Sequence, residues 1–381
     1  MRLSERGQVD PFIVMDVMEA ARAAEAAGRP VIHMEVGQPG TGAPRAALER
    51  LAGELADDAM GYTVGLGLPE LRARIARHYG DWYGVDLDPR RVVVTSGASG
   101  AFVLAFSALF DAGDRVGLGY PCYPSYRQIL RAMSLEPVGI RTAIEDRFQP
   151  RARDVRGLDG LIVASPANPT GSILSARDLA ALAEACEASG AALISDEIYH
   201  GLGHAARAAS ALEVTDEVYV VNSFSKYFSM TGWRVGWMVV PEDHVRVIER
   251  LAQNLYICAP HAAQRLALHA MGCGAELEAN VAVYAANRRI VLNGLVQAGL
   301  TVTAPADGAF YVYADVSGVC GDSRALAAEI LKEVDVAVTP GVDFDPEEGH
   351  RWLRLSYAGR TADIEEGMAR LVRFFGTRGG G

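Results

Sequence analysis

Residues 161–196 read LIVASPANPTGSILSARDLAALAEACEASGAALISD, a stretch in which two short apolar runs flank an alanine- and leucine-rich segment. The runs Leu161–Ala164 and Ala192–Ser195 are almost continuously apolar, as expected for strands that are buried on both faces of a sheet. Between them, apolar residues recur at helical spacing over Ala176–Ala188. A strand, a helix and a second strand in this order form the repeating unit of a parallel sheet. The stretch therefore predicts an α/β fold.

The same alternation of strands and helices continues on both sides of this stretch, from about residue 91 to residue 240. We expect a mostly parallel sheet of about seven strands, covered by helices on both faces. The predicted strands are Val92–Thr95, Arg115–Leu118, Pro137–Arg141, Leu161–Ala164, Ala192–Ser195, Val218–Asn222 and Val235–Val240.

After Pro260 the pattern changes to a long helix at about residues 275–297, followed by shorter strands and helices up to about residue 356. This mixture is typical of a smaller α+β domain. We expect a large domain over residues 43–272. A small domain would combine the N-terminal segment 1–42 with residues 273–381.

The overall composition limits the classes of partner. The chain has 381 residues and a net charge of −11, which argues against nucleic acid or an anionic membrane surface as the main partner. The longest apolar run is far shorter than the roughly 20 residues of a membrane helix, and the N-terminus lacks the apolar core of a signal peptide. Its five cysteines are scattered without CxxC spacing. These features predict a soluble, reduced, cytoplasmic protein without a structural metal.

Lysine is rare in this chain, because only Lys226 and Lys332 occur among its 36 basic residues. Arginine can replace lysine as a solvated charge, but it cannot lose its proton and form an imine. Lys332 lies in an amphipathic stretch and suits a surface position. Lys226 lies in a Ser-Phe-Ser-Lys segment directly after a predicted strand, which favours a chemical role.

Polar and glycine-rich segments follow several of the predicted strands at their carboxyl ends, where open α/β sheets bind ligands. Each segment alone also suits a structural turn or cap. Together, at one edge of one sheet, they predict a place for an aldehyde that carries a phosphate. The segments are Ser96–Gly100, Ser165–Gly171, Asp196–His200 and Ser223–Lys226, with Arg234 eight residues further on.

Several of these segments also match an ordered set of motifs. In chain order the set is Gly37-Gln38-Pro39, Tyr120-Pro121-x-Tyr123-Pro124, Asn168-Pro169-x-Gly171, Asp196-x-x-Tyr199, Ser223-x-Ser225-Lys226, Arg234 and Arg354-Leu355-Ser356-Tyr357. From about Pro11 to Tyr357 the chain resembles the class I/II aminotransferases, which are fold-type I enzymes of the aspartate aminotransferase superfamily that depend on pyridoxal 5′-phosphate.

The resemblance implies three catalytic residues. Lys226 would form a Schiff base with the cofactor aldehyde and then move a proton as general base and acid. Asp196 would pair with the pyridinium nitrogen and keep it protonated. Tyr199 would hydrogen-bond the phenolic oxygen of the cofactor together with Asn168, and Tyr123 would stack on the ring.

The resemblance also implies the residues that bind the phosphate of the cofactor. They are Arg234, Ser223, Ser99 and the backbone N–H of Ala98. In related enzymes a tyrosine reaches this phosphate from the second subunit, and Tyr62 matches it. The chain would therefore form a homodimer with shared active sites.

The α-carboxylate of the substrate would be bound by Arg354, with help from Asn168 and the backbone of Gly37. The expected reaction transfers an amino group between an L-α-amino acid and a 2-oxo acid, with glutamate and 2-oxoglutarate as one pair. Residues 40–44 depart from the acidic and aromatic residues of many relatives, which leaves the substrate preference open.

Two other functions remain open at this stage. A β- or γ-lyase or a decarboxylating enzyme can be built on the same scaffold, because a fold does not determine a reaction. The chain could also be an effector-binding module of a regulator. The acidic charge, the missing DNA-binding extension and the intact Lys226 argue against such a module.

Overall fold

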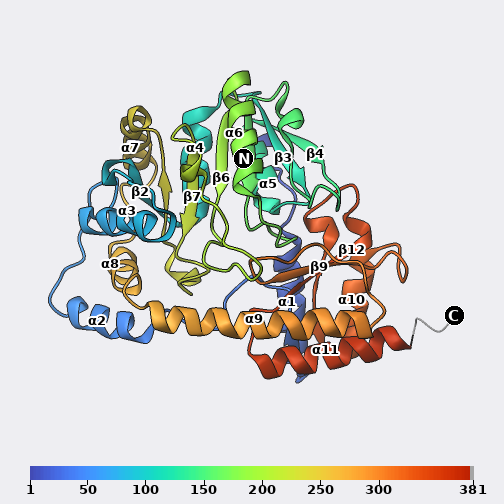
Figure 1. Ribbon diagram of the computed structural model, residues 1–381. Coiled ribbons are helices and arrows are strands. Elements are labelled where there is room, and N and C mark those ends of the chain that lie inside the picture. Colours follow the sequence, from blue (N-terminus) through green and yellow to red (C-terminus); the bar gives the residue numbers. More distant parts are fainter. Residues whose placement is uncertain (378–381) are drawn as a thin grey trace.

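A computed structural model describes residues 1–377 of the chain, and its centre is a seven-stranded sheet (Figure 1). The order across the sheet is β2-β8-β7-β6-β5-β3-β4, and only β8 runs antiparallel to its two neighbours. This arrangement confirms the predicted α/β fold and its mostly parallel sheet. The strands are β2 (Val92–Thr95), β3 (Arg115–Tyr120), β4 (Glu136–Arg141), β5 (Gly160–Ala164), β6 (Ala192–Asp196), β7 (Tyr219–Ser223) and β8 (Gly236–Val239).

Successive residues of each strand are buried on opposite faces of this sheet, as the two-residue period of a strand requires. In β5, Ile162 packs in one apolar cluster, whereas Leu161 and Val163 pack in the other. Fully burying each such side chain stabilises the fold by roughly 1.5–3 kcal/mol. One face is covered by α4 (Gly97–Leu109), α5 (Pro124–Ala132) and α7 (Val245–Leu255), and the other by α3 (Pro69–Tyr83), α6 (Ala176–Ser189) and α8 (His261–Ala270).

Local sequence signals explain where α6 begins and ends. The side chain of Ser175 accepts a hydrogen bond from the backbone N–H of Asp178 and so caps the first turn. At the other end, Gly190 adopts φ 74°, a left-handed conformation that glycine reaches without strain. The helix therefore matches the predicted Ala176–Ala188 to within one residue.

The remaining elements lie below the large sheet in the view of Figure 1, where the long helix α9 packs along α11 and α2 packs against α8. A three-stranded antiparallel sheet has the order β11-β12-β9, and the short strands β1 and β10 pair in parallel. These elements are α1 (Ile13–Ala26), β1 (Ile32–His33), α2 (Arg45–Leu55), α9 (Gly274–Gln297), β9 (Tyr311–Asp315), α10 (Ser323–Val334), β10 (Val336–Ala337), β11 (Thr339–Pro340), β12 (Trp352–Ser356) and α11 (Thr361–Gly376).

The N-terminal segment is fastened to the C-terminal part of the chain. The backbone N–H groups of Ile13 and Val14 donate to the two carboxylate oxygens of Asp343, and both nitrogen–oxygen distances are 3.2 Å. The pairing of β1 with β10 adds a second link between the two ends. Within residues 1–377, no helix is both long and apolar enough to cross a membrane.

Candidate active site

The predicted site residues gather in a cavity of about 190 Å³ beyond the carboxyl ends of β5, β6 and β7. Its walls come from the large sheet, from the segment before α1 and from the C-terminal sheet. The lining residues are Phe12, Val14, Met15, Val36, Gly37, Ala98, Ser99, Phe102, Tyr123, Tyr126, Ile129, Ala164, Asn168, Asp196, Ile198, Tyr199, Ser225, Lys226, Thr231, Arg234, Tyr311 and Arg354.

Lys226 follows β7, and its amine faces this cavity. The Nζ atom donates a hydrogen bond of 2.6 Å to the backbone carbonyl of Gly37. Burial, helped by the positive charge of Arg354, lowers the pKa of Lys226 to about 8. A lowered pKa leaves a substantial fraction of the amine unprotonated near neutral pH, as a nucleophile or a general base requires.

Asp196 is the last residue of β6 and is buried in the same cavity. One carboxylate oxygen accepts from the backbone N–H of Ile198 at 3.0 Å, and the other accepts from the hydroxyl of Tyr126. Burial raises the pKa of Asp196 to about 6 despite these hydrogen bonds. A buried acid of this kind lacks a bound cation, and the protonated ring nitrogen of pyridoxal phosphate would supply one.

The first turn of α4 and the guanidinium of Arg234 form a second part of the cavity. The side chain of Ser96 does not cap the start of α4. The first backbone N–H groups of this helix are therefore available to an anion. Arg234 lies so close to Gly97 that a Cβ there would meet its Nη2 at 2.6 Å. Glycine therefore allows the guanidinium to sit against the helix N-terminus, and the pair suits a phosphate.

Arg354 of β12 reaches the cavity from the opposite side and is only 2% exposed. Its Nη1 donates to the side-chain oxygen of Asn168 at 2.9 Å, while its Nη2 donates to the carbonyl of Glu35 and, at 3.3 Å, to Thr339. Its Nε is buried without any partner. An unpaired donor on a buried cation fits a carboxylate of a ligand.

Two tyrosines connect the large sheet to the C-terminal sheet inside the cavity. The hydroxyls of Tyr199 and Tyr311 lie 2.8 Å apart. The guanidinium carbon of Arg354 lies over the Tyr311 ring, 4.3 Å from the ring centroid. A Cβ on Gly37 would come within 1.8 Å of the Tyr311 hydroxyl, so only glycine fits at that position. Tyr123 lies at the rim, with Phe12 packed edge-on against it at 5.8 Å.

Ten of the twelve predicted site residues line the cavity, and two do not. Ser223 is buried, and its hydroxyl lies 2.9 Å from that of Ser225 and 3.2 Å from the carbonyl of Val235. Ser225 lines the cavity instead. Tyr62 is 82% exposed at the surface of the protomer. The roles of all twelve residues stay predictions.

Sequence reasoning missed Tyr126 and Tyr311, which hydrogen-bond Asp196 and Tyr199. Tyr126 comes three residues after Tyr123 on α5, and this helical spacing could have revealed it. Tyr311 had no local signal, because it lies in a distant strand. Sequence reasoning also missed the apolar part of the cavity wall, which Phe12 and Met15 of the N-terminal segment form.

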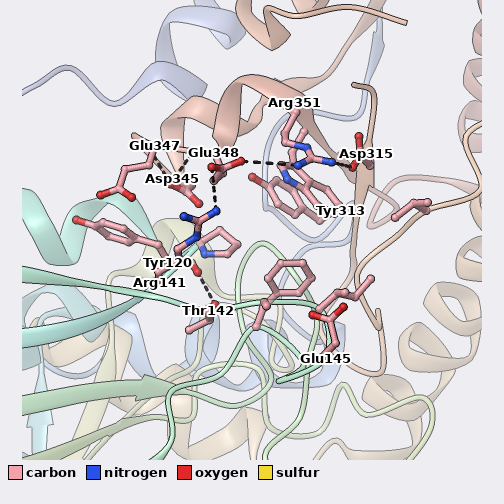
Figure 2. Close-up of a pocket in the computed structure, with 16 residues that line it drawn as sticks. Tyr120, Arg141, Thr142, Glu145, Tyr313, Asp315, Asp345, Glu347, Glu348 and Arg351 are labelled. Carbon is pink, nitrogen blue, oxygen red and sulfur yellow. Dashed lines mark hydrogen bonds and ion pairs between the residues drawn. The ribbon is translucent and has the colours of Figure 1, made fainter. Parts of the chain in front are cut away.

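A larger cavity of about 250 Å³ lies elsewhere, between β4 and the C-terminal sheet (Figure 2). Arg141 pairs with Glu348 at 3.3 Å, and Arg351 pairs with Asp315 at 2.8 Å. Both arginines are therefore engaged by acids of the protein, and the residues that line this cavity include no lysine. Among the described residues, no cluster of three or more His, Cys, Asp and Glu side chains could hold a metal.

The fold and the first cavity suit an enzyme of the pyridoxal-phosphate type, because a partly buried lysine, a buried carboxylate and an arginine against a helix N-terminus share one cavity. Residues 29–371 match the family model of class I and II aminotransferases. The chain belongs to this family of transferases, and pyridoxal phosphate is its cofactor.

Individual relatives are similar to the protein along almost the whole chain, in sequence and in structure. A valine–pyruvate aminotransferase from Mycobacterium tuberculosis is 44% identical over 378 residues, which cover 97% of both chains. A solved structure from Silicibacter pomeroyi, described provisionally as an aminotransferase, is 65% identical, covers 99% of this chain and 100% of that chain, and has a TM-score of 0.95. Aspartate aminotransferase from Thermus thermophilus, solved with maleate, is 30% identical with 98% and 100% coverage and a TM-score of 0.91.

Proposed function

We propose that this aminotransferase moves an amino group between an L-α-amino acid and a 2-oxo acid, with Lys226 as the residue that carries the proton. The observation that supports this most directly is the buried amine of Lys226, which shares one cavity with Asp196 and Arg354. Pyridoxal phosphate, when bound, supplies an aldehyde that condenses with amines and a ring that accepts electrons from the substrate Cα. Lys226 would take the proton from Cα as general base and deliver it, as general acid, to the carbon that had been the cofactor's aldehyde.

The other residues bind and orient. Arg234, the Ser99 side chain and the Ala98 N–H hold the phosphate, and Ser225 takes the place first expected for Ser223. Asp196 keeps the ring nitrogen protonated, a role for which a buried carboxylate without a cation is well suited.

Three further groups complete this arrangement. Tyr199 and Asn168 donate hydrogen bonds to the phenolic oxygen, and Tyr123 covers the ring. Arg354 binds the α-carboxylate through its unpaired Nε, assisted by Asn168 and by the backbone of Gly37.

We further propose a monocarboxylic amino acid with an apolar side chain as one substrate. Phe12, directly before α1, and Val14 and Met15 in its first turn contribute to the cavity, and α5 contributes Ile129. Once Arg234 holds the phosphate and Arg354 the α-carboxylate, the described lining residues of one protomer offer no third arginine or second lysine. A glutamate side chain would need such a cation. The valine–pyruvate specificity of the relative from Mycobacterium tuberculosis supports an apolar donor.

The test is to add single amino acids to the holoenzyme and follow the visible absorbance of the bound cofactor and the release of 2-oxo acid. Valine, leucine and alanine should each convert the cofactor to its amine form, and a 2-oxo acid should restore it. Aspartate and glutamate should react at least about tenfold more slowly, the effect of roughly 1.4 kcal/mol. Fast reaction of glutamate would restore the glutamate and 2-oxoglutarate pair. Release of ammonia or carbon dioxide without a second substrate would instead identify a lyase or a decarboxylase.

We propose a homodimer in which Tyr62 reaches the phosphate site of the second subunit. Tyr62 is 82% exposed in the protomer although it carries a large aromatic ring, and Val64 two residues further on is exposed as well. Large apolar side chains left exposed in one protomer suit a surface that a second subunit covers. Sedimentation of the holoenzyme as a fully active monomer would refute this dimer.

Two further expectations stay proposals. The division into a large domain (43–272) and a small domain (1–42 with 273–381) agrees with the separate sheets, although residues 378–381 lie outside the described part of the chain. A cytoplasmic location is supported by the five cysteines, which are all free thiols.

A further inference from the structure

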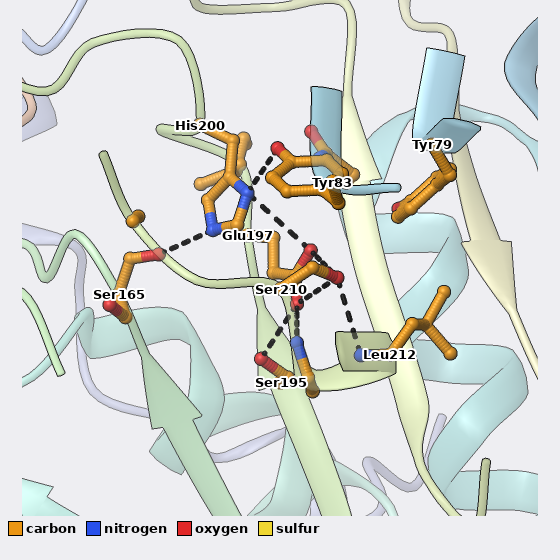
Figure 3. A network of polar contacts seen from close by, with 12 residues as sticks. Tyr79, Tyr83, Ser165, Ser195, Glu197, His200, Ser210 and Leu212 are labelled. Atoms are coloured by element: carbon orange, nitrogen blue, oxygen red, sulfur yellow. Dashed lines mark hydrogen bonds and ion pairs between the residues drawn. The ribbon is translucent and has the colours of Figure 1, made fainter. Parts of the chain in front are cut away.

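A buried polar network is centred on His200 (Figure 3), the residue that follows Tyr199 of the candidate active site. The side chain is almost fully buried, at 4% exposure of the residue. Both ring nitrogens have partners. Nδ1 lies 2.6 Å from the hydroxyl of Tyr83 at the end of α3, and Nε2 lies 2.9 Å from the backbone carbonyl of Ser165.

The chemistry of these partners determines which nitrogen carries the proton. A carbonyl oxygen can only accept, so Nε2 of His200 must be the N–H that donates to Ser165. Nδ1 then has only a lone pair and accepts from the Tyr83 hydroxyl. The two hydrogen bonds therefore run in one direction, from Tyr83 through the imidazole to Ser165.

The surroundings keep this ring neutral. Burial lowers the pKa of His200 to about 3, although the hydrogen bond to the Ser165 carbonyl acts in the opposite direction, and the charge of Arg207 lowers it further. Glu197 lies 3.6 Å from Nδ1 and is buried as well. A neutral ring with both nitrogens engaged has no free position for proton transfer, so His200 does not act as an acid or a base.

The ends of this chain of hydrogen bonds connect to groups of the candidate site. Ser165 begins the segment that carries Asn168, and its N–H donates to the carbonyl of Asp196 at 3.2 Å. Tyr199 directly precedes His200 in the turn after β6. The imidazole therefore ties the turn that carries Tyr199 to the segment that carries Asn168.

Glu197 fastens the same turn from its other side. Its carboxylate accepts from the Ser210 hydroxyl at 2.9 Å and from the Ala211 N–H at 2.7 Å, and the Ser195 hydroxyl donates to it at 3.3 Å. Asp196 lines the cavity, whereas Glu197 does not, and Figure 3 shows the Glu197 side chain among Ser195 and Ser210. The turn is therefore held at both Glu197 and His200.

We propose that His200, held by Tyr83, is a positioning residue that fixes Tyr199 and Asn168 relative to each other. This inference rests on the proposed function, in which both side chains donate to the phenolic oxygen of the cofactor. A small shift of either donor changes how strongly that oxygen is stabilised as an anion. The pH at which the resting holoenzyme changes colour reports this stabilisation directly, without turnover.

Three variants separate the parts of the network. Tyr83→Phe removes one hydroxyl and leaves Nδ1 without its donor. His200→Gln keeps a side-chain N–H that can reach the Ser165 carbonyl, whereas His200→Leu removes both hydrogen bonds. Tyr219→Phe is the matched control, because Tyr219 makes an equivalent hydrogen bond of 2.8 Å to Nδ1 of His244 at the far end of β7.

Each holoenzyme is titrated with pH while its visible absorbance is recorded, and kcat/KM and the thermal midpoint are measured beside it. We expect His200→Leu, which loses both hydrogen bonds, to shift the absorbance midpoint by roughly half a pH unit or more and to lower kcat/KM about tenfold, as loss of buried hydrogen bonds allows. Tyr83→Phe and His200→Gln each lose the bond between Tyr83 and His200 but keep the bond to Ser165, so both should show smaller shifts of similar size. Tyr219→Phe should leave both quantities unchanged.

The proposal is overturned if Tyr83→Phe and His200→Leu lose only thermal stability and keep the wild-type midpoint and kcat/KM. It is equally overturned if His200→Gln is as impaired as His200→Leu, because the bond to Ser165 would then be irrelevant. Should His200→Leu not fold, Tyr83→Phe decides alone. Failure of the proposed function is distinguishable, since the wild type itself would then show no amino transfer.

Discussion

The hydroxyl groups of Tyr199 and Tyr311 lie 2.8 Å apart, and this hydrogen bond joins the turn after β6 to strand β9 of the C-terminal sheet. Burial raises the pKa of both phenols, so both remain protonated. Each hydroxyl has one proton to donate. If Tyr311 donates to Tyr199, the proton of Tyr199 is free to be donated to a ligand in the cavity.

Tyr311→Phe removes the partner of Tyr199 and should lower kcat about fivefold and the free energy of unfolding by about 1 kcal/mol. Steady-state kinetics and chemical unfolding measure the two effects. Tyr357→Phe is the control, since that buried tyrosine donates only a long bond of 3.4 Å to the carbonyl of Ala309. Equal losses of kcat in both variants would show that the effect is one of packing.

Lys226→Arg should abolish amino transfer, with a loss of about 10³-fold or more, because arginine keeps the charge but cannot give up its proton. The visible absorbance of the bound cofactor should change as well. Lys332→Arg provides the control, because Lys332 is the second lysine of the chain and lies exposed on α10. Residual activity near the wild-type level in Lys226→Arg would remove this lysine from the reaction.

Asp196→Asn should inactivate the enzyme but stabilise the protein without cofactor. Burial raises the pKa of Asp196 from 3.8 to about 6. The unfolded chain therefore ionises at a lower pH than the folded one, and the stability contributed by this group is lost as pH rises through about 6. The gain from asparagine should be of the order of 2–3 kcal/mol above pH 7 and absent below about pH 4. Chemical unfolding of the two apoproteins at both pH values tests this, and a pH-independent difference would contradict it.

Arg354→Lys should raise KM for the amino acid about 30-fold, because lysine cannot hold Asn168 and Glu35 with one side of a planar group while it presents an unpaired N–H to the carboxylate. A change confined to kcat would indicate another role. Arg351→Lys tests whether any arginine near β12 has this effect, because Arg351 is bound to Asp315 outside the cavity. Its KM should equal that of the wild type.

The architecture and most of the pocket could be predicted because their signals are local. Residues at the carboxyl ends of neighbouring parallel strands must meet at one edge, so Asn168, Asp196 and Lys226 were found from short stretches of sequence. The difference between Ser223 and Ser225 could not be found in this way. Which of two serines faces a cavity depends on the turn after the strand.

The missed residues lie far from the motifs in sequence. Tyr311 reaches Tyr199 only because β9 packs across the sheet edge, and Phe12 reaches Tyr123 only because the N-terminal segment folds back. Such contacts depend on tertiary packing, which no local period reports. Tyr62 is harder still, because its predicted partner belongs to another subunit.

The pairing of β1 with β10 has a consequence for how the protein is made. Ile32 lies opposite Val336, and Arg354 follows in β12, so the pocket takes walls from both ends of one polypeptide. During translation the N-terminal residues of the pocket leave the ribosome first, and the C-terminal residues follow seconds to minutes later. The last of them leave only when synthesis is almost complete. A nascent chain truncated before residue 336 lacks Arg354 and the partner strand of its own N-terminal segment. The cofactor can therefore bind to the complete pocket only after the chain has been synthesised in full. Cofactor binding is thus a late step in the biosynthesis of the enzyme.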